Sequence, residues 1–103
     1  MPPAIFTVRA TITPDREEAF NRWYHTEHIP QLLRYRGASG ARRYRKLTGD
    51  DEYQYMAVYE FESRETLEAF MKSDHFAELI KEYNANFGDV STRVRDTYEQ
   101  VWP

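Results

Sequence analysis

Apolar and polar residues alternate along four segments of the chain, at residues 4–12, 41–47, 53–61 and 90–101. In the first segment every second residue from Phe6 is apolar, and the third segment repeats this pattern. Such alternation, with many β-branched and aromatic residues, is typical of strands that bury one face. The second segment shows the pattern most weakly. The sequence therefore predicts four strands, with a hairpin turn between the second and the third.

A first helix is predicted between the first two strands. Residues 13–15 (Thr-Pro-Asp) are typical of a helix start, because a hydroxyl, a proline and an acid suit the N-cap and the first turn. Phe20, Tyr24 and His28 then recur four residues apart and share one helix face. We expect this helix to end near His28, because the residue before Pro30 is disfavoured in the α region. A connector at residues 30–37 would follow, ending in a turn.

A second helical region is predicted between the third and fourth strands. Ser63 is a credible N-cap, and Ser73 indicates that the helix starts again. Apolar residues recur three and four apart after each of these serines, as on the buried face of an amphipathic helix: Leu67, Phe70, Met71, Phe76, Leu79, Ile80 and Tyr83. We expect a loop at residues 84–88 before the last strand.

The order of these elements is βαββαβ, which predicts a ferredoxin-like α+β sandwich: one domain spanning residues 1–103, with an antiparallel sheet and two helices on one of its faces. The other sheet face would carry Ile5, Thr7, Gln54, Met56 and Val58. This face is too apolar to lie comfortably in water. We therefore expect a homodimer that packs through the open face of the sheet.

Composition and charge exclude several classes of protein. The net charge is −3, and the chain contains no cysteine, so neither a basic surface for nucleic acid nor a thiolate site is indicated. An RNA-recognition module has the same element order, but residues 52–56 (Glu-Tyr-Gln-Tyr-Met) lack its glycine and place an acid where it needs a base. Neither a secretory signal nor a membrane span is visible, so we expect a soluble, cytoplasmic protein that binds neither nucleic acid nor membrane.

The segment at residues 20–33 (FNRWYHTEHIPQLL), together with the element order, resembles the dimeric α+β barrel superfamily. More narrowly it resembles the EthD-like proteins, named after ethyl tert-butyl ether degradation. The first helix of those proteins carries a phenylalanine, an aromatic pair and a His-x-Pro motif, which correspond here to Phe20, Trp23-Tyr24 and His28-Ile29-Pro30. Gly37 and Arg43-Tyr44 match a later turn and strand. The superfamily holds isomerases, cyclases, cofactor-free oxygenases and haem-related enzymes, so the resemblance implies a fold more than an activity.

His28 is the strongest candidate for chemistry, because imidazole exchanges protons near physiological pH. Tyr24 would assist it as a second catalytic residue. The structural alternative is a buried histidine that hydrogen-bonds the connector and holds the helix end in place. The substrate-binding candidates are aromatic or cationic and fall on predicted strands or on the first helix: Trp23, Arg43, Tyr44, Tyr55 and Tyr59. Such aromatic residues are also common in ordinary cores, and Arg43 could equally protect a sheet edge.

No metal or tightly bound cofactor is predicted. His25 and His28 would share one turn of helix without an obvious third ligand. We expect a small homodimer that binds a small aromatic or polyketide-like molecule, with His28 transferring protons in an isomerisation, cyclisation or dehydration. A non-catalytic ligand-binding or accessory protein is the alternative, and haem binding through His28 is a further possibility by analogy with the superfamily.

Overall fold

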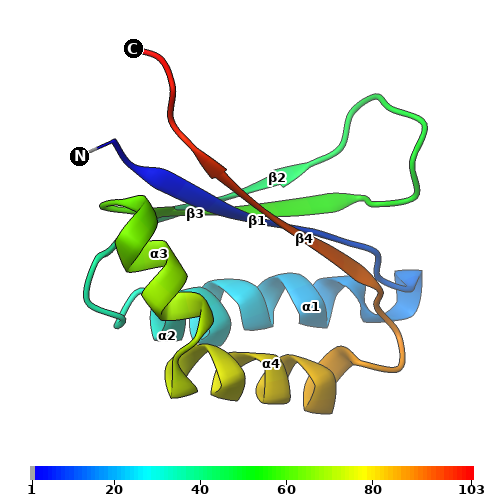
Figure 1. Cartoon of the computed structure of the whole chain (residues 1–103). Coiled ribbons are helices and arrows are strands. Elements are labelled where there is room, and N and C mark those ends of the chain that lie inside the picture. The colour runs from blue at the N-terminus through cyan, green and yellow to red at the C-terminus, as the bar shows by residue number, and fades with distance from the viewer. Residues whose placement is uncertain (1) are drawn as a thin grey trace.

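A computed structural model describes residues 2–103 as a four-stranded antiparallel sheet with helices on one face (Figure 1). The two termini lie at the same end of the sheet, and the β2–β3 hairpin extends beyond the other end. The elements in chain order are β1 (Ala4–Ala10), η1 (Pro14–Arg16), α1 (Glu17–Trp23), η2 (Tyr24–His28), α2 (Ile29–Leu32), β2 (Ala38–Arg45), β3 (Tyr55–Phe61), α3 (Arg64–Met71), α4 (Asp74–Phe87) and β4 (Arg93–Glu99). The predicted ferredoxin-like α+β fold is confirmed.

The strand order is β2-β3-β1-β4, so the two most hydrophobic strands lie in the centre. Val8 of β1 faces Ala57 of β3 and Arg95 of β4 across the sheet. Because side chains alternate between faces, this register places every second residue of each strand toward the helices. The buried core lies between that face and the helices, and its largest members are aromatic: Phe6, Phe20, Tyr24, Tyr59, Phe61, Phe70 and Tyr83.

The two serine caps act as the sequence predicts. Thr66 donates its backbone N–H to Ser63 Oγ at the start of α3, and Phe76 does the same to Ser73 Oγ at the start of α4. These bonds satisfy backbone groups that a helix start would leave without partners. At Thr13 the side chain makes no such bond.

Both predicted helix ends are wrong. The first helical segment does not stop before Pro30 but continues through α2 to Leu32. The predicted loop at residues 84–88 is largely helical, because α4 continues to Phe87. Phe87 is buried against the ring of Phe20, with ring centroids 5.1 Å apart. Core packing of this ring stabilises one more turn than the local sequence favours.

Strand β2 begins earlier than predicted, at Ala38, with an irregularity in its pairing between Ala38 and Gly40. The preceding Gly37 has a φ of 101°, and a Cβ there would lie 2.3 Å from Thr66 Cγ2. Glycine is therefore required at this turn, both for its backbone conformation and for the close approach of α3. Strands β3 and β4 are each shorter than predicted.

Candidate functional site

The centre of the site is a π-helical turn, η2, in the middle of the first helical segment. Ile29 donates its N–H to the carbonyl of Tyr24, five residues back, instead of the usual four. The hydrogen-bond register thus shifts just before Pro30, whose ring would obstruct a regular α-helix and which has no N–H to donate. This shift explains how the helix passes the proline. Such turns often occur at functional sites.

The π-helical turn places His28 against three aromatic rings. Its ring stacks on Trp23, with centroids 4.4 Å apart and planes 21° apart, and it meets Tyr24 and Tyr83 edge-on. Residues five apart would point about 140° away from each other on an α-helix, at roughly 100° per residue. The wider turn brings the rings of Trp23 and His28 together. His28 is only 8% exposed.

His28 makes no hydrogen bond within residues 2–103, and its Nδ1 is buried without a partner. Burial, together with the positive charges of Arg93 and Arg43, lowers the pKa of His28 to about 4. The imidazole is therefore neutral at physiological pH. The structural alternative from the sequence assigned His28 a hydrogen bond to the connector. Instead His75, on α4, bonds with its Nε2 to the carbonyl of Gln31, 2.8 Å away, near the end of α2.

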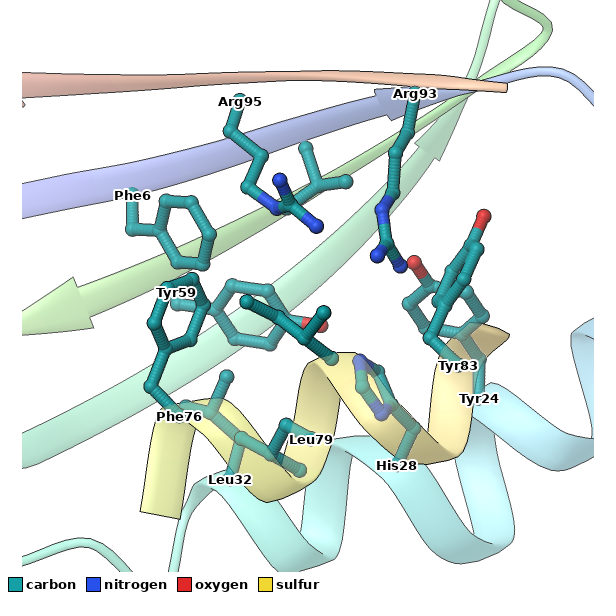
Figure 2. A pocket seen from close by; sticks show the side chains of 12 residues that line it. Phe6, Tyr24, His28, Leu32, Tyr59, Phe76, Leu79, Tyr83, Arg93 and Arg95 are labelled. Carbon is teal, nitrogen blue, oxygen red and sulfur yellow. The ribbon is translucent and has the colours of Figure 1, made fainter. Parts of the chain in front are cut away.

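A pocket lies between the helix face of the sheet and α4, and His28 forms part of its wall (Figure 2). Its other lining residues come from both central strands, the first helical segment, α4 and the edge strand β4: Phe6, Val8, Tyr24, Leu32, Tyr59, Phe76, Leu79, Ile80, Tyr83, Arg93 and Arg95. The free space for the centres of water molecules is about 20 Å³, which is close to what one ordered water needs. A larger ligand therefore requires side chains at the pocket wall to move.

Tyrosine hydroxyls supply further polar groups at this pocket. The hydroxyl of Tyr59 is buried and has no hydrogen-bond partner among residues 2–103, and burial raises its pKa. Burial also raises the pKa of Tyr24 well above its usual value. Tyr83 differs, because its hydroxyl pairs with Ser91 Oγ at 2.6 Å. All three phenols are protonated at neutral pH and can act as hydrogen-bond donors.

Arg93 and Arg95 are pocket residues that the sequence reasoning did not identify. They lie opposite Ala10 and Val8 of β1, so both extend toward the helices (Figure 2). The Arg93 guanidinium lies over the ring of Tyr83, 3.7 Å from its centroid, and donates to Asn84 Oδ1 at 3.2 Å. The only signal in the sequence is two cations spaced two apart in a strand. That spacing predicts that the two side chains share one face of the sheet, but it does not predict which face.

The structure brings together only part of the predicted set. Tyr24, His28 and Tyr59 line the pocket, whereas Trp23 lies behind His28 and contacts its ring. Tyr44 is 48% exposed and lies outside the pocket. It pairs with Met56 on the sheet face away from the helices. Tyr44 therefore does not lie at this pocket as expected, because β2 directs the other set of alternate residues toward the helices.

Arg43 and Tyr55 form a separate cluster on the other side of Tyr24. The Arg43 guanidinium carbon lies 4.2 Å from the centroid of the Tyr24 ring and 4.9 Å from that of Tyr55. Arg43 also donates to Asn21 Oδ1 at 2.7 Å, and Tyr55 donates to a carboxylate oxygen of Glu17. This cluster packs against the side of Tyr24 that is away from the pocket, and its residues do not line the pocket. These contacts indicate that Arg43 has a structural role.

Groups of three or more side chains placed to bind a metal do not occur in the described part of the chain. His25 is exposed and contacts Arg43, 3.3 Å away, while His28 is buried. The surroundings of His28 do not fit a haem, because Trp23, Tyr24 and Tyr83 occupy the space around its ring. Within residues 2–103 no helix has the length and apolar character needed to cross a membrane.

Comparison with solved structures identifies the same fold in several proteins. An ethyl tert-butyl ether degradation (EthD) family protein from Bacillus halodurans aligns with a TM-score of 0.67 at 18% identity, covering 93% of this chain and 97% of that one. A dabb family protein with a ferredoxin-like fold from Mesorhizobium loti aligns with a TM-score of 0.74 at 11% identity, covering 99% and 100%. SnoaB from Streptomyces nogalater, described as a cofactor-independent oxygenase, gives 0.66 at 14%, covering 100% and 97%.

These alignments confirm the resemblance to the dimeric α+β barrel superfamily and its EthD-like proteins at the level of the fold. A search of curated protein sequences finds no match. The profile of one family, described as a domain of unknown function (DUF4286), matches residues 3–101. Because this match covers almost the whole sequence, the chain belongs to the DUF4286 family.

Proposed function

We propose that this protein binds a small aromatic or polyketide-like molecule in the pocket beside α4, and that His28 transfers a proton to and from it. One observation carries the proposal. His28 Nδ1 and the Tyr59 hydroxyl are both buried without hydrogen-bond partners in residues 2–103, and both residues line the same pocket. Leaving such groups unpaired costs about 1–3 kcal/mol each. A ligand with polar oxygens would recover that free energy, and apolar walls suit its rings.

The chemistry follows from the protonation states of these side chains. Neutral His28 can accept a proton from a carbon next to a carbonyl, and the resulting imidazolium can return that proton to another carbon or to a leaving hydroxyl. The phenols of Tyr24 and Tyr59 remain protonated and can donate hydrogen bonds to the carbonyl oxygen as it becomes an enolate. This sequence describes an isomerisation, cyclisation or dehydration and needs no bound cofactor.

The test uses benzoylacetone, an aryl β-diketone, in deuterated buffer, with NMR following the exchange of its acidic carbon-bound protons. We expect the protein to accelerate exchange above the buffer rate, and His28→Gln to lower the acceleration about 100-fold or more. His25→Gln is the matched control, because His25 is exposed and outside the pocket. Equal exchange by His28→Gln and the unchanged protein would overturn the catalytic role of His28.

A non-catalytic binding protein is the second candidate, because the low pKa of His28 makes it a weak base until a ligand raises that pKa. Binding without accelerated exchange would favour this candidate. Binding is measured with the same diketone by calorimetry. Native mass spectrometry of the purified protein would reveal a ligand retained from the host.

We further propose a homodimer through the face of the sheet that carries no helix. Partly buried Ile5, Met56 and Val58 lie on this face beside exposed Tyr44 and Tyr98. Such an apolar face on an antiparallel sheet favours packing against a second sheet. Arg9 forms ion pairs with Asp51 and Asp96 on the same face, so charge would not oppose the contact.

A further inference from the structure

Two cations face the pocket from the edge strand β4 without a carboxylate to balance them. Within residues 2–103, neither Arg93 nor Arg95 is within 4.0 Å of an Asp or Glu carboxylate oxygen. On the other sheet face, by contrast, Arg9 contacts two aspartates. Burial lowers the pKa of Arg93, and the charge of Arg95 lowers it further. The pocket wall therefore carries an uncompensated positive charge.

These cations lie close to the polar groups without partners. Figure 2 shows both guanidinium groups extending from β4 into the space bounded by Tyr59, Tyr24 and His28. The positive charge of Arg93 contributes to the low pKa of His28, so the electric field of Arg93 acts on the imidazole. Arg43, behind Tyr24, adds to this field. Among the residues that the structure describes, none with an acidic side chain lines the pocket.

We propose that the ligand of this pocket is an anion, an aromatic carboxylate or a stabilised enolate, whose negative charge is held by Arg93 and Arg95. This inference rests on the proposed function, because it names the class of molecule for the same site. Guanidinium groups bind planar, delocalised oxyanions through paired, charge-assisted hydrogen bonds. The apolar body would lie against Phe6, Phe76 and Leu79, which line the same space. Both arginines are at least partly exposed, so they can move aside to admit it.

An anion between the arginines would also change His28. The groups that face its ring are Tyr24 and Trp23 from its own helical segment, Tyr83 from α4, Tyr59 from β3 and Arg93 from β4. None of these is negatively charged at neutral pH. A bound anion would offset the field of the arginines, so the affinity of His28 for a proton would rise on binding. The ligand would thereby make the imidazole a stronger base.

The test compares naphthoate with naphthamide, its neutral analogue of nearly the same shape, by calorimetry at pH 7. We expect naphthoate to bind about tenfold to a hundredfold more tightly, as charge-assisted hydrogen bonds predict. The preference should disappear in the double variant Arg93→Gln, Arg95→Gln and remain in Arg36→Gln, whose side chain is exposed in the connector before β2. Added salt should weaken binding of naphthoate more than that of naphthamide.

The outcomes separate this inference from the proposed function. Equal affinity for the two compounds, or a preference that survives the double variant, would overturn the anion inference while leaving a small-molecule site intact. Binding of neither compound at millimolar concentration would overturn both. Circular dichroism melting of the double variant verifies that it folds. If it does not fold, Arg95→Gln alone is used, because Arg95 is the more exposed of the two and makes no hydrogen bond to another side chain in residues 2–103.

Discussion

The rings of Trp23 and His28 stack with their centroids 4.4 Å apart, although the residues are five positions apart in one helical segment. This contact depends on the π-helical turn of residues Tyr24–His28. It covers one face of the imidazole and leaves the Nδ1 edge of the ring buried at the pocket, without a partner in the described part of the chain. Proline at position 30 and the shifted hydrogen bonds before it therefore determine how His28 is presented.

Stability should fall with acid in a range set by His28. The pKa of His28 is about 4 in the folded protein and 6.5 when unfolded. Between these values only the unfolded chain binds the proton at this histidine. The contribution of neutral His28 to the free energy of unfolding is therefore fully present above pH 6.5 and decreases as the pH falls to about 4. The loss approaches about 3 kcal/mol. Denaturant unfolding across this range measures it. His28→Gln should remove this part of the pH dependence, and exposed His25→Gln should keep it. A slope unchanged in His28→Gln would contradict the assignment.

Removing the Tyr59 hydroxyl should stabilise the protein or leave its stability unchanged. The hydroxyl is buried and lacks a partner within residues 2–103, so Tyr59→Phe removes an unpaired polar group, a gain of up to about 1–2 kcal/mol. Tyr83→Phe is the matched control. It removes the hydrogen bond to Ser91 and should cost about 1 kcal/mol. Chemical denaturation measures both free energies of unfolding. Destabilisation by Tyr59→Phe as large as that by Tyr83→Phe would show that the Tyr59 hydroxyl has a partner in solution.

Two glycines at the start of β2 should respond differently to alanine. Gly37→Ala forces a side chain into a φ of 101° and brings Cβ to 2.3 Å from Thr66 Cγ2, so we expect a loss of about 2 kcal/mol or more. The Cβ of Gly40→Ala would meet no atom of the described residues within 4 Å, so this variant should change stability by less than about 1 kcal/mol. Thermal melting of the two variants provides the measurement. Similar melting temperatures would mean that the turn at Gly37 relaxes more easily than this packing implies.

A charge in the centre of the open sheet face should prevent dimerisation. Val58 lies on β3 opposite Thr7 of β1, among the apolar side chains of this face. We expect the unchanged protein to sediment as a dimer and Val58→Glu as a monomer, because a buried unpaired carboxylate costs several kcal/mol. Thr48→Glu, in the exposed hairpin loop, should remain dimeric. Analytical ultracentrifugation distinguishes these states, and a monomeric unchanged protein at high concentration would contradict the proposal.

Much of the fold could be predicted from the sequence because its signals are local. The alternation in β1 and β3, the serine caps at Ser63 and Ser73, and the glycine turn at Gly37 each act over a few residues. Helix ends were less predictable. Phe87 extends α4 through contacts with Phe20, far away in the sequence. Pro30 is accommodated by a π-helical turn, which leaves no distinct local pattern.

The sequence by itself determined the order of the elements, the fold class and the helix face that carries Phe20, Tyr24 and His28, because periodicity and capping are properties of neighbouring residues. Only the tertiary structure decided which alternate residues of the edge strands face the helices. That choice depends on register against β1 and β3, and a shift of one residue reverses it. It placed Arg93 and Arg95 at the pocket and Tyr44 on the opposite face.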